Sequence, residues 1–208
     1  MIEDADAGPW LVVGLGNPGT HYTGNRHNVG AMVVAQLTAD LGVTLSAHRS
    51  RAQVAEVRLP PAAGRPGERF VLAVPTAYMN ESGGQVTSVA RFFRIEPARL
   101  VVVHDELDLP FADLMLKRGG GEGGHNGLRS ISQSLGTKDY GRLRVGIGRP
   151  PGRMDPADFV LRDFSPTERK DLPFVVGEAV DAVLLVVREG WDRAQERVNG
   201  ERRSRQTR

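Results

Sequence analysis

The stretch Gly14–Gly30, GLGNPGTHYTGNRHNVG, decides the fold of this chain. It follows the short apolar run Trp10–Val13, which predicts a buried strand, and it precedes apolar residues that recur at helical spacing between Val29 and Leu41. Gly42 then stands where a helix C-cap glycine is expected. We therefore expect a loop from a strand to a helix, and such loops gather at the carboxyl ends of the strands in α/β sheets, where ligands bind.

Outward from this loop, strand patterns alternate with helical patterns along the chain. We expect strands near 10–15, 51–59, 70–74, 100–103, 113–118 and 142–147, an extended piece at 43–45, and helices near 28–41, 82–94, 128–135 and 174–187. Residues 60–68 are expected to form a solvated turn and residues 149–156 a loop. The alternation predicts a single α/β domain over residues 1–198, with residues 1–8 frayed and a flexible basic tail at 199–208.

The composition limits the class of protein. The 208 residues suffice for one α/β domain with its own core. The absence of cysteine excludes disulfides, thiolate catalysis and zinc sites built on cysteine. No apolar run reaches membrane-spanning length and no secretory signal opens the chain, so we expect a cytoplasmic protein with no membrane segment.

The cationic side chains are nearly all arginine. Lysine occurs only at 117, 138 and 170, so arginine supplies the rest of the 27 cations. Arginine holds phosphate through two parallel hydrogen bonds, which favours a phosphate-rich partner. Codon usage in a GC-rich genome explains the same bias, and the composition leaves both explanations open.

His27 lies just ahead of the helix expected from about residue 28, and it is a candidate for acid–base chemistry at neutral pH. The positive end of the helix dipole disfavours an imidazolium, so we expect a neutral ring that can accept a proton. A carboxylate would fix its tautomer, and the candidate is Asp105, at the end of the central strand Leu100–Val103. A surface or capping role is the alternative when His27 is taken alone.

The sequence His104-Asp105-Glu106-Leu107-Asp108 could instead bind a hard metal ion through oxygen ligands. Neighbours on a strand point to opposite faces, so His104 and Asp105 should not both face one cleft. We favour Asp105 in the cleft, with His104 structural and with Glu106 and Asp108 as loop carboxylates.

Three asparagines, Asn17, Asn80 and Asn126, lie at expected corners between a strand and a helix. Each could simply cap a helix. Together they could converge on one cleft, where carboxamides bind peptide groups, hold a water or stabilise an oxyanion.

Two glycine-rich motifs suggest other ligands. Gly14–Gly19 matches the dinucleotide pattern G-x-G-x-x-G, but the expected helix starts about ten residues too late for such a site. Lys117–Gly121 precedes a helix as an anion-binding loop would, without the G-K-[ST] ending of a P-loop. Arg142, Arg144 and Arg149 flank the next strand, where they could follow a nucleic-acid backbone or form a solvated basic face.

Taken together, the motifs resemble the bacterial-type peptidyl-tRNA hydrolase family. The resemblance is carried in order by VVGLGNPGTHYTGNRHNVG (12–30), PTAYMNESG (75–83), HDELDLPFA (104–112), KRGGGEGGHNGLRSI (117–131), YGRLRVGIGRP (140–150) and DFVLRDF (158–164). It implies a monomeric α/β fold with a twisted mixed sheet flanked by helices. It also implies hydrolysis of the ester that joins a peptide to the terminal ribose of tRNA. We expect no cofactor, no metal and no obligate protein partner.

Position by position, the resemblance makes His27 the catalytic base and Asp105 its paired carboxylate. It assigns further roles to the asparagines that hold substrate and water (Asn17, Asn80 and Asn126), to the walls of the cleft (Tyr22 and Met79) and to the basic pair for the tRNA 5′-phosphate (Lys117 and Arg144). His125 matches a family motif, but we assign it no chemistry.

The chain departs from the family pattern at Met115, where many members carry a basic residue, and the neighbouring Arg118 is a candidate to compensate. As a mechanism, we expect Asp105 to hold the Nδ1–H of His27 while Nε2 takes a proton from the attacking water. Two rival functions stay open: a catalytically inactive RNA-binding relative of the same fold, and a dinucleotide-dependent oxidoreductase.

Overall fold

The computed structural model describes residues 8–61 and 67–206. Within them a seven-stranded sheet has the order β2-β3-β4-β1-β5-β7-β6. The strands are β1 (Trp10–Gly14), β2 (Ser46–Ala47), β3 (Ala52–Arg58), β4 (Arg69–Pro75), β5 (Leu100–Glu106), β6 (Leu114–Arg118) and β7 (Gly141–Gly146). The helices are α1 (Val29–Leu41), α2 (Ser82–Phe93), α3 (Asn126–Leu135), α4 (Pro156–Val160), α5 (Glu168–Glu189) and α6 (Trp191–Gln206). Short 3₁₀ turns are η1 (Thr20–Tyr22), η2 (Arg26–Asn28), η3 (Met79–Glu81) and η4 (Pro97–Arg99).

The sheet is mixed, as expected. Strands β4, β1, β5 and β7 run parallel, whereas β2, β3 and β6 pair antiparallel with their neighbours. The carboxyl ends of the four parallel strands therefore meet at one edge of the sheet, and the Gly14–Gly30 loop leaves β1 at that edge. The single α/β domain that the alternating patterns predict is confirmed.

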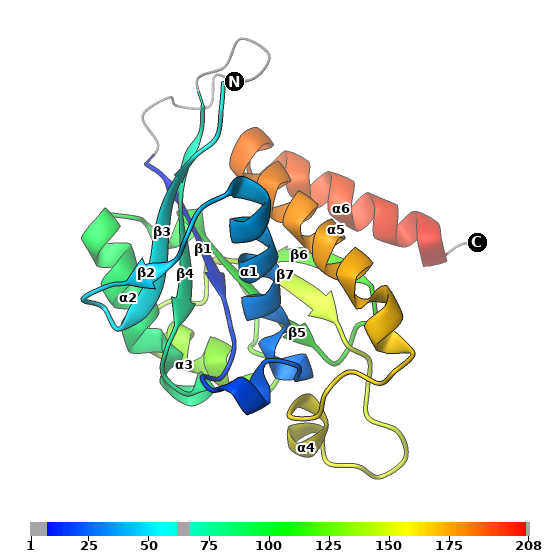
Figure 1. Ribbon diagram of the computed structural model, residues 1–208. Helices are drawn as coiled ribbons and strands as arrows, with labels where there is room; N and C mark the ends of the chain where they lie inside the picture. The colour runs from blue at the N-terminus through cyan, green and yellow to red at the C-terminus, as the bar shows by residue number, and fades with distance from the viewer. Residues whose placement is uncertain (1–7, 62–66, 207–208) are drawn as a thin grey trace.

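Helices cover both faces of the sheet (Figure 1), with α1, α5 and α6 on one face and α2 and α3 on the other. Successive residues of a strand point to opposite faces, so each central strand contributes to two cores. Val101 and Val103 pack with α1 and α5, whereas Val102 packs with α2 and α3. No helix among the described residues is both long and apolar enough to cross a lipid bilayer.

Most expected elements are present, with shifted ends. Strand β5 continues beyond its apolar run because Asp105 and Glu106 pair with Val145 and Gly146 of β7. The extended piece expected at 43–45 lies instead at 46–47. Part of the expected frayed end, residues 1–7, and part of the expected turn, residues 62–66, lie outside the described residues.

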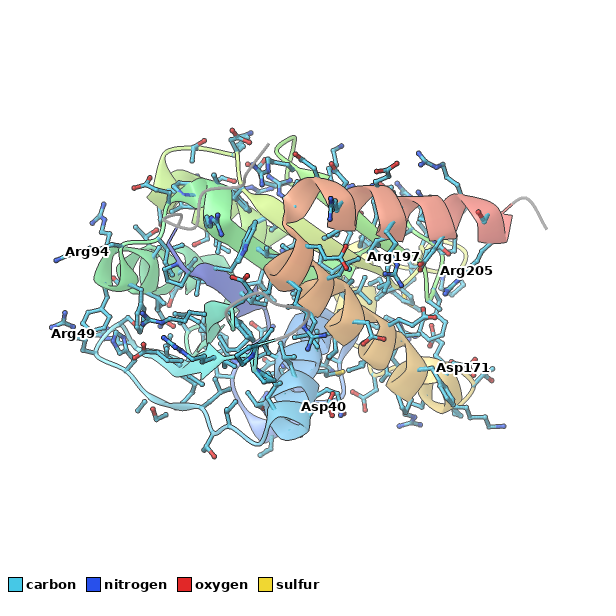
Figure 2. All side chains as sticks on the ribbon, turned by 90° about the horizontal axis from the view of Figure 1, so that it is seen from above. Asp40, Arg49, Arg94, Asp171, Arg197 and Arg205 are labelled. Atoms are coloured by element: carbon cyan, nitrogen blue, oxygen red, sulfur yellow. The ribbon has the colours of Figure 1, made fainter. Side chains whose placement is uncertain are left out.

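The C-terminal end differs from the expectation. Residues 199–206 were expected to be a flexible tail, but they are the last turns of α6, so that expectation is wrong for them. Trp191 and Ala194 bury the start of the helix, and Arg205 forms an ion pair with Glu178 of α5 at 2.7 Å. Figure 2 shows Arg197 and Arg205 on the side of α6 toward α5. Residues 207–208 lie outside the described residues.

Helix α6 also covers the edge strand β6. The Asn199 carboxamide accepts a hydrogen bond from the Leu116 N–H at 3.0 Å and donates to the Leu116 carbonyl oxygen at 2.9 Å. Gln195 donates to the same carbonyl at 3.1 Å. These side chains satisfy backbone groups that an edge strand otherwise leaves open.

Candidate active site

A close approach of α1 to the sheet sets the position of His27. Gly30, in the first turn of α1, lies so near the backbone that a Cβ there would overlap the carbonyl oxygen of Val103 in β5. The backbone hydrogen bonds from Leu15 N to Val103 O (3.1 Å) and from Ala31 N to Leu15 O (2.9 Å) fix this contact. As a result, the turn η2 that carries His27 lies beside the carboxyl end of β5, where Asp105 is.

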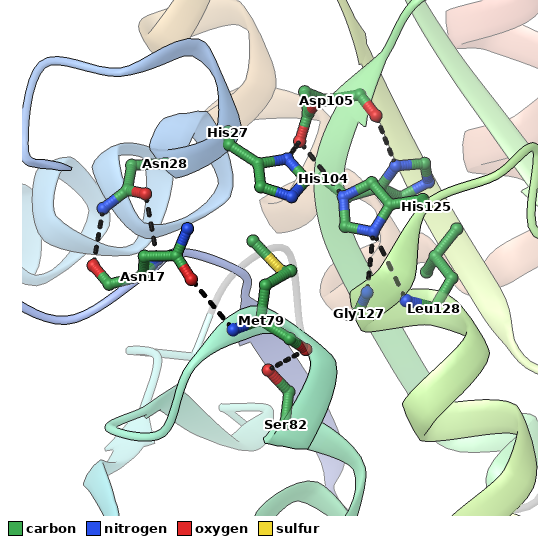
Figure 3. A network of polar contacts seen from close by, with 10 residues as sticks. All are labelled: Asn17, His27, Asn28, Met79, Ser82, His104, Asp105, His125, Gly127 and Leu128. Atoms are coloured by element: carbon green, nitrogen blue, oxygen red, sulfur yellow. Dashed lines mark hydrogen bonds and ion pairs between the residues drawn. The ribbon is translucent and has the colours of Figure 1, made fainter. Parts of the chain in front are cut away.

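His27 and Asp105, which are 78 residues apart in sequence, are hydrogen-bonded (Figure 3). His27 Nδ1 is 2.8 Å from Asp105 Oδ1, and both side chains are nearly buried. A carboxylate only accepts, so Nδ1 carries the proton, and in a neutral ring the lone pair is then on Nε2. In Figure 3 this second nitrogen points away from Asp105, toward Asn17 and Met79.

His125 contributes a second donor to the same oxygen. Its Nε2 is 3.1 Å from Asp105 Oδ1, and its Nδ1 accepts the backbone N–H groups of Gly127 and Leu128 at 3.1 and 3.3 Å. His125 is thus the N-cap of α3, and the cap fixes its tautomer with the proton on Nε2. Asp105 Oδ1 therefore receives two imidazole N–H groups.

These donors keep Asp105 ionised. Burial raises the pKa of the Asp105 carboxyl, but His27 and His125 outweigh burial and hold that pKa well below its usual value of 3.8. A buried carboxylate beside His27 is stabilised further when that ring gains a proton.

His104 packs against this cluster and has a structural role. Its Nδ1–H donates to the backbone oxygen of Asp105 at 2.7 Å, and its ring meets His125 edge-on with 5.0 Å between centroids. Burial lowers the pKa of His104 well below its usual value of 6.5, and His125 acts in the same direction. The expectation that His104 and Asp105 would not both face one cleft is wrong, because both border the cavity, but of the two only Asp105 is hydrogen-bonded to His27.

The three groups His27, Asp105 and His125 could also be considered as metal ligands, since their ligand atoms lie within 4.8 Å of one another. A metal at His125 Nε2 needs a lone pair there, whereas the α3 cap places the proton on that nitrogen. The donor set therefore fits a hydrogen-bonded cluster better than a metal centre.

Asn17 presents one side of its carboxamide to His27. Its Oδ1 accepts the backbone N–H of Met79 at 2.9 Å, which leaves the amide nitrogen directed toward His27 in Figure 3. Asn28 fixes the Asn17 backbone through two hydrogen bonds of 2.9 Å each, from Asn17 N to Asn28 Oδ1 and from Asn28 Nδ2 to Asn17 O. Asn17 is thus held as a hydrogen-bond donor.

The other two asparagines do not cap helices. The N-caps of η3, α2 and α3 are Tyr78, Glu81 and His125. The Asn80 carboxamide is exposed and has no hydrogen-bond partner among the described residues, and Asn126 only accepts from Arg129 at 3.2 Å. Both therefore have hydrogen-bonding capacity to offer a ligand.

The three asparagines, Met79 and the His27 pair border one cavity of about 620 Å³. An apolar wall of the cavity comes from α4 and the residue after it: Pro156, Ala157, Val160 and Leu161. Tyr22 is not among the described residues that border the cavity, and its ring lies beside His21 in η1, with 4.0 Å between centroids.

The basic residues separate into two groups. Lys117, Met115 and Arg144 share one face of the antiparallel pair β6–β7, where Lys117 is exposed. Arg144 forms an ion pair with Glu106 at 3.3 Å. Glu106 is buried at the end of β5, so its expected role as a loop carboxylate is wrong.

The side chains of Arg142 and Arg118 make contacts within the protein. Arg142 is fully buried and donates to the carbonyl oxygens of Gly121 (2.6 Å) and Gly120 (3.0 Å), so it cannot follow a nucleic-acid backbone. These inward carbonyls also argue against an anion-binding loop. Arg118 lies over the Trp191 ring at 4.9 Å, on the opposite face from Lys117, so it does not compensate for Met115.

Sequence reasoning missed His125, Asn28 and the α4 wall as parts of the site. His125 stands directly before an expected helix, but histidine is not among the favoured N-cap residues, so its position gave a weak signal. Asp155-Pro156 did carry a helix-start signal, since Asp155 accepts from Ala157 N at 2.8 Å and Pro156 is the first helical residue.

Comparisons with known proteins agree on one family. A family model described as peptidyl-tRNA hydrolase matches residues 11–207. A peptidyl-tRNA hydrolase of Frankia alni is 59% identical over 92% of this chain and 94% of its own, and one of Kineococcus radiotolerans is 61% identical over 90% and 96%. The crystal structure of peptidyl-tRNA hydrolase from Acinetobacter baumannii has a TM-score of 0.84 and 33% identity, covering 95% of this chain and 97% of that one.

Proposed function

The chain belongs to the peptidyl-tRNA hydrolase family, and we propose that it cuts the ester between peptide and tRNA with His27 as the general base for a water molecule. One observation carries this assignment: Asp105 Oδ1 holds the Nδ1–H of His27 at 2.8 Å, so Nε2 faces the cavity with its lone pair. A neutral imidazole held in this tautomer can take a proton as water attacks the ester carbonyl.

The resulting imidazolium is stabilised by the buried carboxylate of Asp105. His27 then returns the proton to the ribose oxygen as the carbon–oxygen bond of the tetrahedral intermediate breaks. The products are a peptide with a free carboxylate and a tRNA with a free terminal hydroxyl. No covalent enzyme intermediate is required, because water is the nucleophile.

Asn17 is suited to the oxyanion of that intermediate. Its Oδ1 is already bonded to Met79 N, so only its N–H groups are available to the cavity. A donor that is held in place before the reaction stabilises developing negative charge at little cost in reorganisation.

Asn80 and Asn126 are suited to the peptide. Each carboxamide can donate and accept, as a peptide group does, and peptide groups are the same in every sequence. Recognition through the main chain gives indifference to side chains, and it disfavours a free aminoacyl-tRNA, which has an ammonium group in place of an amide. In this proposal Met79 borders the peptide within the cavity, and Tyr22 meets only a part of the substrate that extends beyond it.

Lys117 and Arg144 are proposed to hold the tRNA 5′-phosphate from the face of β6 and β7 that they share. Arg144 would exchange or share its contact with Glu106 when phosphate binds. We further propose that the enzyme works as a monomer in the cytoplasm, without an obligate protein partner, because its substrate arises from translation.

Neither rival function gains support from the site. A relative that only binds RNA does not need a base, a buried carboxylate and a second imidazole donor on one oxygen. In the dinucleotide pattern, Gly19 is followed by the 3₁₀ turn η1 rather than by a long helix, and α1 begins only at Val29.

The test is hydrolysis of N-acetylaminoacyl-tRNA by the variant His27→Ala. We expect the rate to fall about 10²–10⁴-fold, the range that a general base contributes. His48→Ala, which replaces a histidine outside the cavity, is the control and should keep the wild-type rate. A folded His27→Ala variant with the wild-type rate would remove the proposal.

A further inference from the structure

Arg26, the residue before His27, is an almost fully buried arginine with no role in the chemistry above. Its Nη1 donates to the backbone oxygens of Arg162 (3.2 Å) and Asp163 (2.7 Å). Its Nη2 forms an ion pair with Glu168 at 2.7 Å. All of these partners follow α4 in the chain, about 140 residues from Arg26, so one side chain joins two distant segments.

The guanidinium is also enclosed by aromatic rings. It lies 4.2 Å from the ring centroid of Phe159 in α4 and 5.4 Å from that of Phe164. A buried guanidinium is costly unless its donors are paired, and here carbonyls, a carboxylate and two ring faces serve its two Nη groups, whereas Nε has no partner among the described residues.

Backbone contacts also join the turn that carries His27 to the segment after α4. Arg26 N donates to Arg162 O at 3.1 Å, and Asn25 and Asp163 form an antiparallel bridge. The Asn25 side chain donates to Asp163 Oδ1 at 2.8 Å. A side chain on Gly24 would press against the Asp163 carboxylate, so this approach is also close. The turn that carries His27 and the segment after α4 are thus bound along three consecutive residues.

The segment held in this way is the apolar wall of the cavity. Val160 and Leu161 border the cavity, and Arg162 follows them directly in the chain. In Figure 1, α4 lies beyond the carboxyl edge of the sheet, close to the start of α1. Arg149 and Asp108 form an ion pair at the exposed rim and border the same cavity.

We propose that Arg26 is a positioning residue that makes the α4 wall and the turn of His27 one rigid unit. Its fork fixes the distance between the wall that contacts the peptide and the imidazole that activates water. This inference rests on the proposed function only for its effect on rate, since the effect on the position of His27 can be observed without substrate.

Lysine cannot replace this fork. A single ammonium reaches the carboxylate or the carbonyls but not both in the same plane, and it does not stack between rings as guanidinium does. Arg26→Lys therefore keeps the charge and most of the buried stem while it loosens the connection. Glu168→Gln is the milder partner variant, because the amide oxygen can still accept from Arg26 and from Ser165 N.

The matched control is Arg205→Lys. Arg205 also forms an arginine–carboxylate ion pair at 2.7 Å, but it lies on α6 (Figure 2) and not at the cavity. Two quantities are measured for each variant of the full chain. The first is the single-turnover rate on N-acetylaminoacyl-tRNA at saturating enzyme. The second is the downfield proton resonance of His27 Nδ1–H in the free protein.

We expect Arg26→Lys to lower the saturated rate about tenfold or more, because small displacements of a reacting group are costly, and to broaden the Nδ1–H resonance. Arg205→Lys should change neither. If Arg26→Lys does not fold, Glu168→Gln should show the same effects to a smaller degree.

A folded Arg26→Lys variant with an unchanged rate and a sharp Nδ1–H resonance would overturn the inference, as would equal rate losses in Arg26→Lys and Arg205→Lys. Failure of the proposed function is distinguishable. In that case His27→Ala keeps its activity, while the resonance still reports whether Arg26 positions His27.

Discussion

Replacing Asp105 with asparagine removes the negative charge beside His27 and changes the shape of the site very little. The carboxamide of the Asp105→Asn variant can still place an oxygen toward His27 and His125, which donate at 2.8 and 3.1 Å in the native protein. What disappears is the attraction between a carboxylate and the imidazolium that forms as water loses its proton. For charges about 4 Å apart at an effective dielectric constant of about 20, that attraction is about 4 kcal/mol.

Losing about 4 kcal/mol of transition-state stabilisation lowers the rate about a thousandfold. Ground-state binding should change little, because in the proposed mechanism His27 takes up its proton only as water attacks. The measurement is single-turnover hydrolysis of N-acetylaminoacyl-tRNA at saturating enzyme, with urea unfolding to show that the variant remains folded.

The control is Asp108→Asn, which removes an exposed carboxylate at the rim of the same cavity. Exposed ion pairs contribute little, so its rate should stay within about threefold of the native rate. A folded Asp105→Asn variant that loses less than about tenfold would refute the reasoning, because the buried charge would then not act on the transition state.

Two further predictions concern the other histidines. His125→Asn should keep the α3 cap, since asparagine is a favoured N-cap, but it cannot reach Asp105; we expect nearly native stability with a rate about tenfold lower, measured by urea unfolding and single-turnover hydrolysis. An unchanged rate would show that one donor suffices for Asp105. Burial lowers the pKa of His104, so below about pH 6.5 the unfolded chain binds a proton at this residue and the folded chain does not. The free energy of unfolding is therefore higher above that pH and decreases as the pH falls. His104→Asn should flatten the pH dependence of the unfolding free energy between pH 6.5 and 5 by up to about 1.4 kcal/mol per pH unit, and curves that stay parallel to the native one would contradict this.

The sequence predicts the centre of the molecule well because its apolar patterns are strong there. The run Leu100–Val103 is buried on both faces of the sheet, and the loop Gly14–Gly30 leads from a strand to a helix as expected. The meeting of His27 with Asp105 follows from those two elements. The carboxyl ends of adjacent parallel strands must lie side by side.

Elements held by polar contacts were harder to predict. Helix α6 has few apolar residues, and it is held in part by Asn199 at the backbone of Leu116 and by Arg205 at Glu178. The burial of Arg142 depends on hydrogen bonds to two carbonyl oxygens of a glycine-rich loop, and no local sequence pattern predicts such a contact. His125 acts on Asp105 only because the cap of α3 turns its ring, which is a tertiary outcome.

The contact between α6 and β6 bears on how this enzyme handles its own substrates. Its substrate carries a peptide, and extended peptides join open sheet edges through their main chains whatever their sequence. Asn199 occupies both outward backbone groups of Leu116, and the opposite edge strand, β2, is only two residues long. Leu116 in β6 therefore offers no open backbone group to which a further strand could pair, whereas residues 55–58 of β3 extend beyond the pairing with β2.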